Sequence, residues 1–172
     1  MKTLNLGCGN QHIPGAINLD VTSKTNPDVV HNLVIRPWPF ADGTFDRVVA
    51  KDVLEHLPDL VKSMEEIYRI SRPGAIVEIT VPHFSSRNAF ADPTHVRFFS
   101  VMTLDYFSSQ HELGFYSDAR FEVLRRQLVF QPTLLNKFVS RLANRRADIY
   151  EHRWTWLFPA WFISFELRVL KS

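Results

Sequence analysis

Short apolar runs separated by polar turns fill the first half of the chain. Four of these runs predict short strands: 2–6, 16–20, 29–31 and 45–50. Apolar residues at helical spacing then follow Asp59, a favourable N-cap, until Arg72-Pro73-Gly74 ends the helix. The nearly continuous apolar run Ala75–Val81 is typical of a strand buried on both faces of a parallel sheet. This alternation predicts an α/β fold with a mostly parallel central sheet.

The second half of the chain is less regular. Residues 83–118 show no clean period apart from a short helix expected near 101–107. A strand is expected over 121–130, an amphipathic helix over 134–147 and a last strand around 163–169, where apolar and polar residues alternate. Two late strands of this kind suit an antiparallel C-terminal edge of the sheet.

The connection between the first two strands is unusually short. Only residues 10–15 separate a glycine-containing turn from the second strand, whereas a crossover helix with its loops needs about ten to twelve residues. The sheet should therefore lack the usual helix between its first two strands. One face then needs cover from the aromatic C-terminal segment or from a second subunit, and we expect a homodimer on this basis.

Length and composition suit one globular domain. The chain has 172 residues, of which 45% are hydrophobic and 22% charged, so it can bury a sizeable core. No stretch is long and apolar enough to span a bilayer, and no signal peptide is visible. The single Cys8 cannot form an intramolecular disulfide, and we expect a cytoplasmic protein.

Charge is distributed unevenly along the chain. Residues 1–119 carry ten basic and fourteen acidic side chains, whereas residues 120–153 carry eight basic and three acidic ones. We expect the basic stretch to be a solvated helix face; an acidic substrate, a membrane surface and nucleic acid are the alternatives. Its apolar face should pack on the sheet, with the nearby tryptophans in a dimer interface, although such a helix also suits peripheral membrane contact through 134–162.

Small or polar residues follow several of the predicted strands: Gly7–Asn10, Asp20, Asn32, Asp52 and His83. In open α/β sheets, ligands bind beyond the carboxyl ends of the strands. Glycines let the backbone approach a ligand closely, and a carboxylate such as Asp20 can accept hydrogen bonds from both hydroxyls of a ribose. The pattern favours a ligand that contains adenosine.

The segment Leu4-Asn5-Leu6-Gly7-Cys8-Gly9-Asn10 resembles the first motif of the class I S-adenosylmethionine-dependent methyltransferases. Segments 30–33, 42–46, 52–57 and 72–74 resemble later landmarks of that family, so the likeness covers about the first 83 residues. It implies a Rossmann-like fold, S-adenosylmethionine as cofactor and methyltransferase activity. We expect a single domain over 1–172, with a cofactor-binding core at 1–83 and acceptor-side, covering and oligomerisation elements at 84–172.

The resemblance also implies roles for individual residues. Gly7 and Gly9 would pass under the methionine part of the cofactor, Asp20 would hold the ribose and Asn32 would lie near the adenine amino group. The full set implied to bind the cofactor is Asn5, Gly7, Cys8, Gly9, Asn10, Asp20, Asn32, Lys51 and Asp52. Asn5 stands where the family motif commonly has an acidic residue, and Asn10 where it commonly has glycine.

Transfer to a hydroxyl or amine needs a group that removes its proton. We expect His83 or His95 to be this base, with Asp92 orienting a neighbour, and we expect His56 to pack or cap locally. No metal is expected, because neither Cys/His ligand pairs nor a metal motif is present; a site made by His83, Asp92 and His95 is the disfavoured alternative.

The predicted function is methyl transfer to a small-molecule acceptor such as a sugar or polysaccharide intermediate. Asp-Pro-Thr-His at 92–95 is similar to small methyltransferase-like proteins associated with such pathways. The alternative is a non-catalytic cofactor-binding or regulatory module. A nucleic-acid methyltransferase is disfavoured, because Asp52-Val53-Leu54-Glu55 stands where an Asn/Asp-Pro-Pro-aromatic tetrad would be expected.

Overall fold

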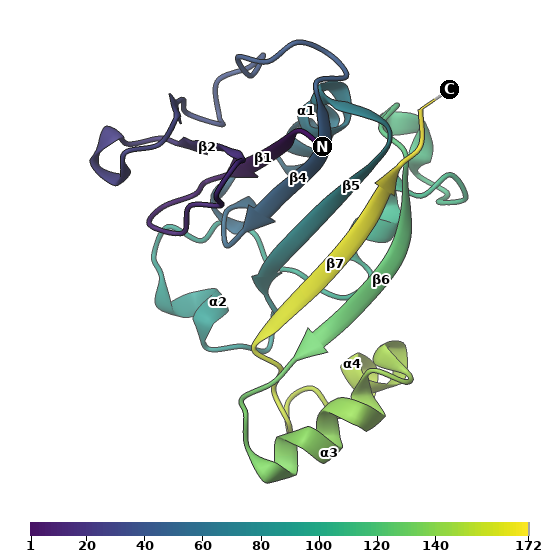
Figure 1. Ribbon diagram of the computed structural model, residues 1–172. Coiled ribbons are helices and arrows are strands. Elements are labelled where there is room, and N and C mark those ends of the chain that lie inside the picture. The colour runs from purple at the N-terminus through teal and green to yellow at the C-terminus, as the bar shows by residue number, and fades with distance from the viewer. Residues whose placement is uncertain (172) are drawn as a thin grey trace.

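A computed structural model, which describes residues 1–171, contains one seven-stranded sheet with the order β3-β2-β1-β4-β5-β7-β6 (Figure 1). The strands are β1 Thr3–Leu6, β2 Ile17–Asp20, β3 Val29–Val30, β4 Phe45–Lys51, β5 Ser71–Pro82, β6 Phe121–Val129 and β7 Phe162–Val169. The helices are α1 Leu60–Ile70, α2 Asn88–Ala91, α3 Leu134–Ala143 and α4 Ala147–Arg153, with 3₁₀ turns at Ser23–Thr25, Leu54–His56, Thr103–Phe107 and Gly114–Tyr116.

The sheet is mostly parallel, as the sequence predicts. β1 to β5 run in one direction, and β7 pairs antiparallel with both β5 and β6 at the C-terminal side of the sheet. β1 and β4 are adjacent and parallel, and the order of the strands along the sheet changes direction between them. The carboxyl ends of these two strands therefore flank the point where open α/β sheets bind their ligands.

Helix α1 forms where the apolar spacing predicts it. The Asp59 side chain accepts a hydrogen bond from the Lys62 N–H at 2.9 Å and caps the helix. Met64, Ile67 and Ile70 are completely buried in the core that α1 forms with the sheet. The helix ends at Ile70, and Arg72-Pro73-Gly74 lies in the irregular first part of β5.

The short β1–β2 connection contains no helix, as expected: none of residues 7–16, all of which the structure describes, is helical. Asn18 holds this connection instead. Its Oδ1 accepts hydrogen bonds from the Ile13 N–H at 2.9 Å and from the Asn5 Nδ2 at 3.0 Å. Asp28 accepts from both the backbone and the side chain of Asn18, at 2.7 and 3.0 Å. A buried polar network therefore does here what a packed helix does in a longer connection.

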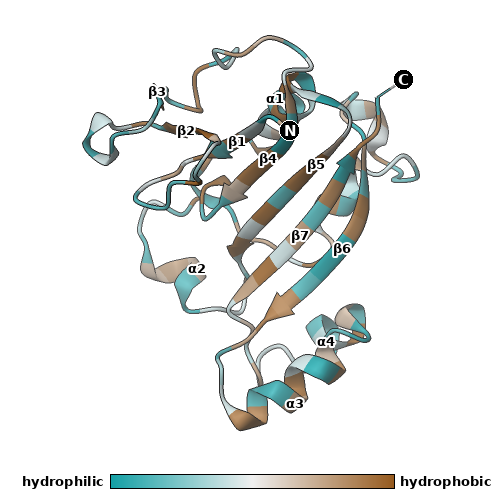
Figure 2. Ribbon diagram, viewed as in Figure 1, coloured by the Kyte–Doolittle hydropathy of each residue, from teal (hydrophilic) through white to brown (hydrophobic). Residues whose placement is uncertain are grey.

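The prediction that Ala75–Val81 is buried on both faces is wrong. Val77, Ile79 and Val81 are buried, whereas Ile76, Glu78 and Thr80 alternate with them and are half-exposed. The second face of β5, β7 and β6 is polar, and hydropathy alternates along these strands (Figure 2).

Ion pairs between neighbouring strands cover this second face. Arg47 pairs with Glu78 at 2.7 Å, and Arg168 pairs with Glu122 at 3.0 Å. Because the face is polar, it needs no apolar cover, so the structural reason we gave for a homodimer does not hold.

The helix expected over 134–147 is two helices, α3 and α4. Asn144 ends α3, and its side chain accepts from the Leu128 N–H at 2.7 Å and donates to the Leu128 carbonyl at 2.9 Å. Both helices lie beyond the end of β6 rather than across the sheet (Figure 1). The exposed fractions of Leu135 and Phe138 are 60% and 62%. The prediction that the apolar face of this segment packs on the sheet is therefore wrong.

None of the helices in residues 1–171 combines the length and the apolar character needed to cross a membrane.

Candidate functional site

A cavity of about 350 Å³ opens at the carboxyl ends of β1 and β4. Its lining residues are Asn5, Gly7, Cys8, Gly9, Asn10, Gln11, His12, Ile13, Lys51 and Asp52. Seven of these ten belong to the set that the sequence resemblance implied. Gln11, His12 and Ile13 were missed because they belong to the short loop that stands in place of the crossover helix. The brevity of that loop was the signal that could have identified them.

The glycine turn after β1 requires glycine for two reasons. Gly7 and Gly9 adopt φ angles of +58° and +46°, in the left-handed region that side chains disfavour. A Cβ atom on Gly7 would also lie 2.5 Å from Cγ2 of Val53, whereas one on Gly9 would meet nothing within 4 Å. Gly7 therefore allows close packing against the segment after β4, and Gly9 leaves the backbone open.

Asp20 is tied directly to this turn. Its Oδ2 accepts a hydrogen bond from the Gly9 N–H at 2.8 Å, and its Oδ1 accepts from the Thr22 N–H at 3.1 Å. Each carboxylate oxygen keeps a further acceptor position. Asp20 therefore lies against the glycine turn, although it is not among the residues that line the cavity.

Three other implied cofactor residues have structural contacts of their own. The Asn5 amide donates to the Gln11 carbonyl at 2.9 Å, so it supports the loop. Cys8 is buried; burial, and then the charge of Asp20, raise the pKa of its thiol. Asn32 lies exposed after β3 and accepts a hydrogen bond from the Val34 N–H at 3.0 Å.

A second, more open cavity of about 510 Å³ adjoins the first at Asp52, which lines both. It is lined by Asp52, Glu55, His56, Pro82, Asn88, Ala91, Asp92, Pro93, His95 and Phe162. Asp52 directly follows β4 and has a φ of +52°, which is rare for a residue other than glycine. Loss of hydration raises the pKa of its carboxyl, against the opposing charges of His95, His56 and Lys51.

The structure brings Asp92 and His95 into this second cavity but not His83. His83 is completely buried, with its Nε2 2.9 Å from Oε1 of Glu151 and its Nδ1 2.7 Å from Oγ of Ser85. Glu151 also accepts from the Ser100 hydroxyl at 2.6 Å and the Val101 N–H at 2.7 Å. Both ring nitrogens of His83 are engaged, so it joins the end of β5 to α4 and does not face either cavity.

Hydrogen bonds orient the two histidines of the second cavity. The Thr94 hydroxyl donates to Oδ1 of Asp92 at 2.6 Å, so its oxygen is left to accept from Nδ1 of His56 at 2.9 Å. Nδ1 of His95 lies 3.2 Å from the Ala89 carbonyl, which can only accept. Each neutral ring therefore carries its proton on Nδ1 and a lone pair on Nε2. Hydrogen bonds from Thr94 lower the pKa of Asp92 and keep it ionised.

Glu55 lies beside these rings and is buried, with an exposed fraction of 1%. Neither of its carboxylate oxygens has a hydrogen-bond partner among the residues that the structure describes. Burial raises the pKa of this carboxyl to about 7, and the charges of Asp52 and Asp92 act in the same direction. Glu55 could not be identified from the sequence, because a single glutamate in a turn forms no recognisable pattern.

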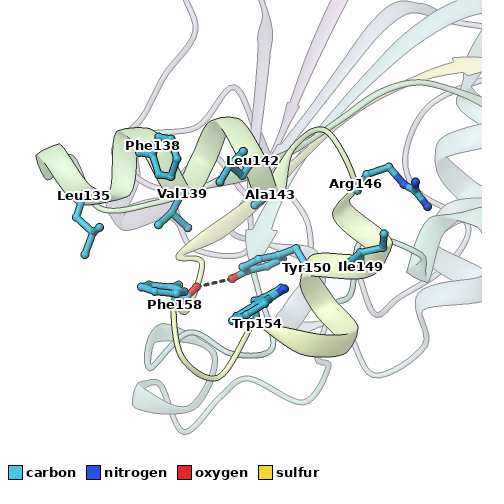
Figure 3. A pocket seen from close by; sticks show the side chains of 10 residues that line it. All are labelled: Leu135, Phe138, Val139, Leu142, Ala143, Arg146, Ile149, Tyr150, Trp154 and Phe158. Carbon is cyan, nitrogen blue, oxygen red and sulfur yellow. Dashed lines mark hydrogen bonds between the residues drawn. The ribbon is translucent and has the colours of Figure 1, made fainter.

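A third cavity, of about 420 Å³, lies between α3 and α4 and is almost wholly apolar (Figure 3). The Tyr150 hydroxyl donates to the Phe158 carbonyl at 2.6 Å across its floor. It is lined in part by Leu135 and Phe138, whose side chains are more than half exposed, and by Trp154, which is about half exposed. It lies away from the carboxyl ends of β1 and β4 and holds no group that could remove a proton.

Comparison with known proteins shows similarity to methyltransferases. Residues 13–79 match the family described as "Methyltransferase domain". A curated relative, cycloartenol-C-24-methyltransferase 1 of Oryza sativa subsp. japonica, is 38% identical over 95 residues. That match covers 50% of this chain but 26% of the relative, so the chain spans about a quarter of its length.

Solved structures share the whole fold. A SAM-dependent methyltransferase from Archaeoglobus fulgidus superposes with a TM-score of 0.68 at 17% identity, covering 97% of this chain and 85% of that one. The YcgJ protein of Bacillus subtilis superposes with a TM-score of 0.64 at 14% identity, covering 99% and 92%. This chain therefore has the fold of the S-adenosylmethionine-dependent methyltransferases, and its residues 13–79 are similar to a methyltransferase domain.

The residues in and beside the first cavity fit S-adenosylmethionine, the cofactor of the similar methyltransferases. A ribose needs an acceptor for its hydroxyls, which the open positions on Asp20 supply. The carboxylate of the methionine part needs a cation or N–H donors, and Lys51 lies exposed at the end of β4. The open side of Gly9 leaves room for a ligand to approach the backbone.

Proposed function

We propose that this domain transfers a methyl group from S-adenosylmethionine to a small hydroxylated molecule. The observation that carries the proposal is the pair of adjoining cavities with Asp52 in the wall of both. One cavity has the glycine turn and Asp20 beside it; the other has histidine and carboxylate side chains. Such a pair suits a reaction that must align a cofactor with an acceptor and exclude water.

The cofactor side is assigned as follows. Gly7 and Gly9 give backbone access, Asp20 holds the ribose hydroxyls, and Lys51 faces the methionine carboxylate. Asn32 is assigned to the adenine, at the end of β3. Asn5, Cys8 and Asn10 shape the loop around the ligand. When bound, S-adenosylmethionine supplies a methyl group on a positively charged sulfur, beside which the Asp52 carboxylate is favourable.

On the acceptor side, His95 is the proposed base. Its Nε2 carries a lone pair in the second cavity, and the Ala89 carbonyl fixes its tautomer. It can take the proton that a hydroxyl or amine loses when it gains a methyl group. Asp92 acts through Thr94 to position His56. His83 is not proposed as a base, because both of its ring nitrogens are engaged.

The chemistry of the second cavity supports a polar acceptor. Asp52, Asn88 and Asp92 offer hydrogen-bonding groups to hydroxyls, as in a sugar or polysaccharide intermediate. An apolar acceptor would leave these groups without partners, which disfavours it. The curated relative carries cycloartenol in its name; this chain covers too little of that protein for its acceptor to be inferred here.

Isothermal titration calorimetry with S-adenosylmethionine and S-adenosylhomocysteine tests the cofactor assignment. We expect micromolar binding that Asp20→Ala weakens at least tenfold. Asp118→Ala, which removes an exposed carboxylate elsewhere, is the matched control and should bind as the wild type does. An acceptor screen with methyl-labelled cofactor follows. Binding without transfer to any acceptor would favour the alternative, a non-catalytic module on the same scaffold.

The expected homodimer and the cytoplasmic location stay predictions. Sedimentation equilibrium measures the first directly. The exposed apolar and basic side chains of α3 and α4 form a surface to which a partner could bind.

A further inference from the structure

Three metal-ligating side chains converge in the second cavity from distant parts of the sequence. Glu55 and His56 come from the 3₁₀ turn after β4, and His95 comes from the loop after α2. One ligand atom from each lies within 4.8 Å of the others, and Oε1 of Glu55 is 4.0 Å from Nε2 of His95. The rings of His56 and His95 meet edge to face, with centroids 4.7 Å apart.

The orientation of both histidines leaves the metal-binding nitrogen free. Nδ1 of His56 is held by the Thr94 hydroxyl, and Nδ1 of His95 by the Ala89 carbonyl. Histidines that ligate metals typically donate their other N–H to such an outer partner, which fixes the ring and its tautomer. Asp92 extends this support on the His56 side, since it binds the Thr94 hydroxyl.

The buried carboxylate of Glu55 indicates a bound cation independently of the two histidines. Its side chain is buried, points toward His95, and has no hydrogen-bond partner for either oxygen among the described residues. A buried carboxylate without a partner is costly in free energy, and a cation is the partner that would remove that cost.

We propose that Glu55, His56 and His95 bind one divalent first-row transition-metal ion of the Mn²⁺ or Zn²⁺ type. Two imidazoles with one carboxylate suit these ions, whereas Ca²⁺ and Mg²⁺ prefer oxygen ligands throughout. Bonds of about 2.1 Å would bring the ligand atoms to about 3.4 Å from each other. Small side-chain rotations achieve this, because no other bond holds the Glu55 carboxylate or either Nε2 atom.

Such an ion would lie on the acceptor side of the site, next to Asp52. Three protein ligands leave coordination positions open for oxygen atoms of an acceptor. An ion held there would occupy the Nε2 lone pair of His95, so in the metal-bound protein the ion, and not His95, would make an acceptor hydroxyl easier to deprotonate. This last role rests on the proposed methyl transfer, whereas ion binding itself does not. No ligand motif marks this site in the sequence, because Glu55 and His56 are adjacent and His95 lies far along the chain, unlike the usual ligand spacings.

Metal titration of the purified full chain without a histidine tag tests the inference. After chelator treatment, calorimetry with Mn²⁺ and with Zn²⁺ should show one site per chain. Glu55→Gln and His95→Ala should each weaken binding by at least about tenfold. His152→Ala, which removes an exposed histidine outside the cluster, should bind like the wild type. The proposal would be overturned if the wild type bound neither ion, or if Glu55→Gln and His95→Ala bound the ions as tightly as the wild type does.

Pulsed electron paramagnetic resonance of Mn²⁺ bound to the wild type serves where a variant fails to fold. We expect nitrogen couplings from two imidazoles; their absence would refute the assignment. Thr94→Val removes the outer partner of His56 and should weaken Mn²⁺ binding about tenfold without touching a ligand atom. All titrations are made without S-adenosylmethionine, so their failure would leave Asp20-dependent cofactor binding as a separate result.

Discussion

The backbone N–H of Gly9 donates a 2.8 Å hydrogen bond to Oδ2 of Asp20, which joins the turn after β1 to the end of β2. The residue assigned to the ribose therefore also holds the glycine turn in place. Any substitution of Asp20 acts on both, and the two effects must be measured separately.

Asp20→Ala should lower the free energy of unfolding by about 1–3 kcal/mol, because it leaves the Gly9 and Thr22 N–H groups without their acceptor. Urea denaturation measures this effect. Asp20→Asn keeps one side-chain oxygen, enough for one of these two N–H groups, and should restore part of the stability, but it should still bind S-adenosylmethionine more weakly. If the asparagine variant binds the cofactor as well as the wild type does, the ribose role is wrong.

His83→Ala should destabilise the fold rather than remove catalysis alone. Its Nε2 faces Glu151 at 2.9 Å in a buried site, and loss of one partner from such a pair costs about 3–5 kcal/mol. Thermal unfolding checks the stability, and cofactor titration of the folded fraction checks the site. A variant with wild-type stability and no turnover would instead support His83 as a base.

The contribution of Glu151 to stability should depend on pH. Burial alone would raise its pKa, but hydrogen bonds from His83, Ser100 and the Val101 N–H outweigh burial and place the pKa below its ordinary value of 4.5. A carboxyl with a lowered folded-state pKa stabilises the fold at pH values above its unfolded-state pKa, and this contribution is lost as the pH falls through the folded value.

Urea midpoints of the wild type and Glu151→Gln between pH 7 and pH 3 measure this dependence. The difference between the two proteins should be largest near neutral pH and shrink steadily below about pH 4.5. A difference that stays constant over the whole range would contradict the assignment.

Asn18→Leu should loosen the first cavity from a distance. The Asn18 side chain bonds the loop at Ile13 and the Asn5 amide, and leaving those groups unpaired costs about 1–3 kcal/mol each. We expect lower stability and faster hydrogen exchange in residues 10–15, together with weaker cofactor binding. Asn136→Leu on α3 is the control and should change none of the three.

The basic face of α3 offers a test of membrane contact. Lys137 and Arg141 on α3 and Arg145 in the turn after it, changed together to Glu, should leave cofactor affinity unchanged, because this segment lies beyond the end of β6. Cosedimentation with vesicles containing anionic lipid should fall in this variant if the surface binds membranes. Equal cosedimentation of both proteins, or none by the wild type, would rule that contact out.

The sequence predicted helices and loops well wherever a local signal exists. Asp59 caps α1, and the six residues 10–15 are too few for a helix, so both features follow from local chemistry. Burial was harder to predict: β5 reads as apolar, yet Glu78 and Arg47 form an ion pair on its open face, and no local pattern shows which face stays uncovered.

Some residues of the candidate site could be predicted from the sequence, and others could not. Gly7, Gly9 and Asp52 follow strands and were identified by position, as ligand-binding residues of open sheets are. The Glu55 carboxylate and the engagement of His83 by Glu151 depend on residues 40 to 68 positions away in the chain, so they follow from the tertiary fold alone. His95 and His56 become neighbours for the same reason.

Because Asp52 lines both cavities, a ligand in either cavity would contact the same residue, and any coupling between the two ligands must be reciprocal. If an occupied first cavity changes acceptor affinity by some factor, an occupied second cavity changes cofactor affinity by that same factor. The coupling energy is therefore the same whichever ligand binds first, and a substitution of Asp52 is the direct way to change it.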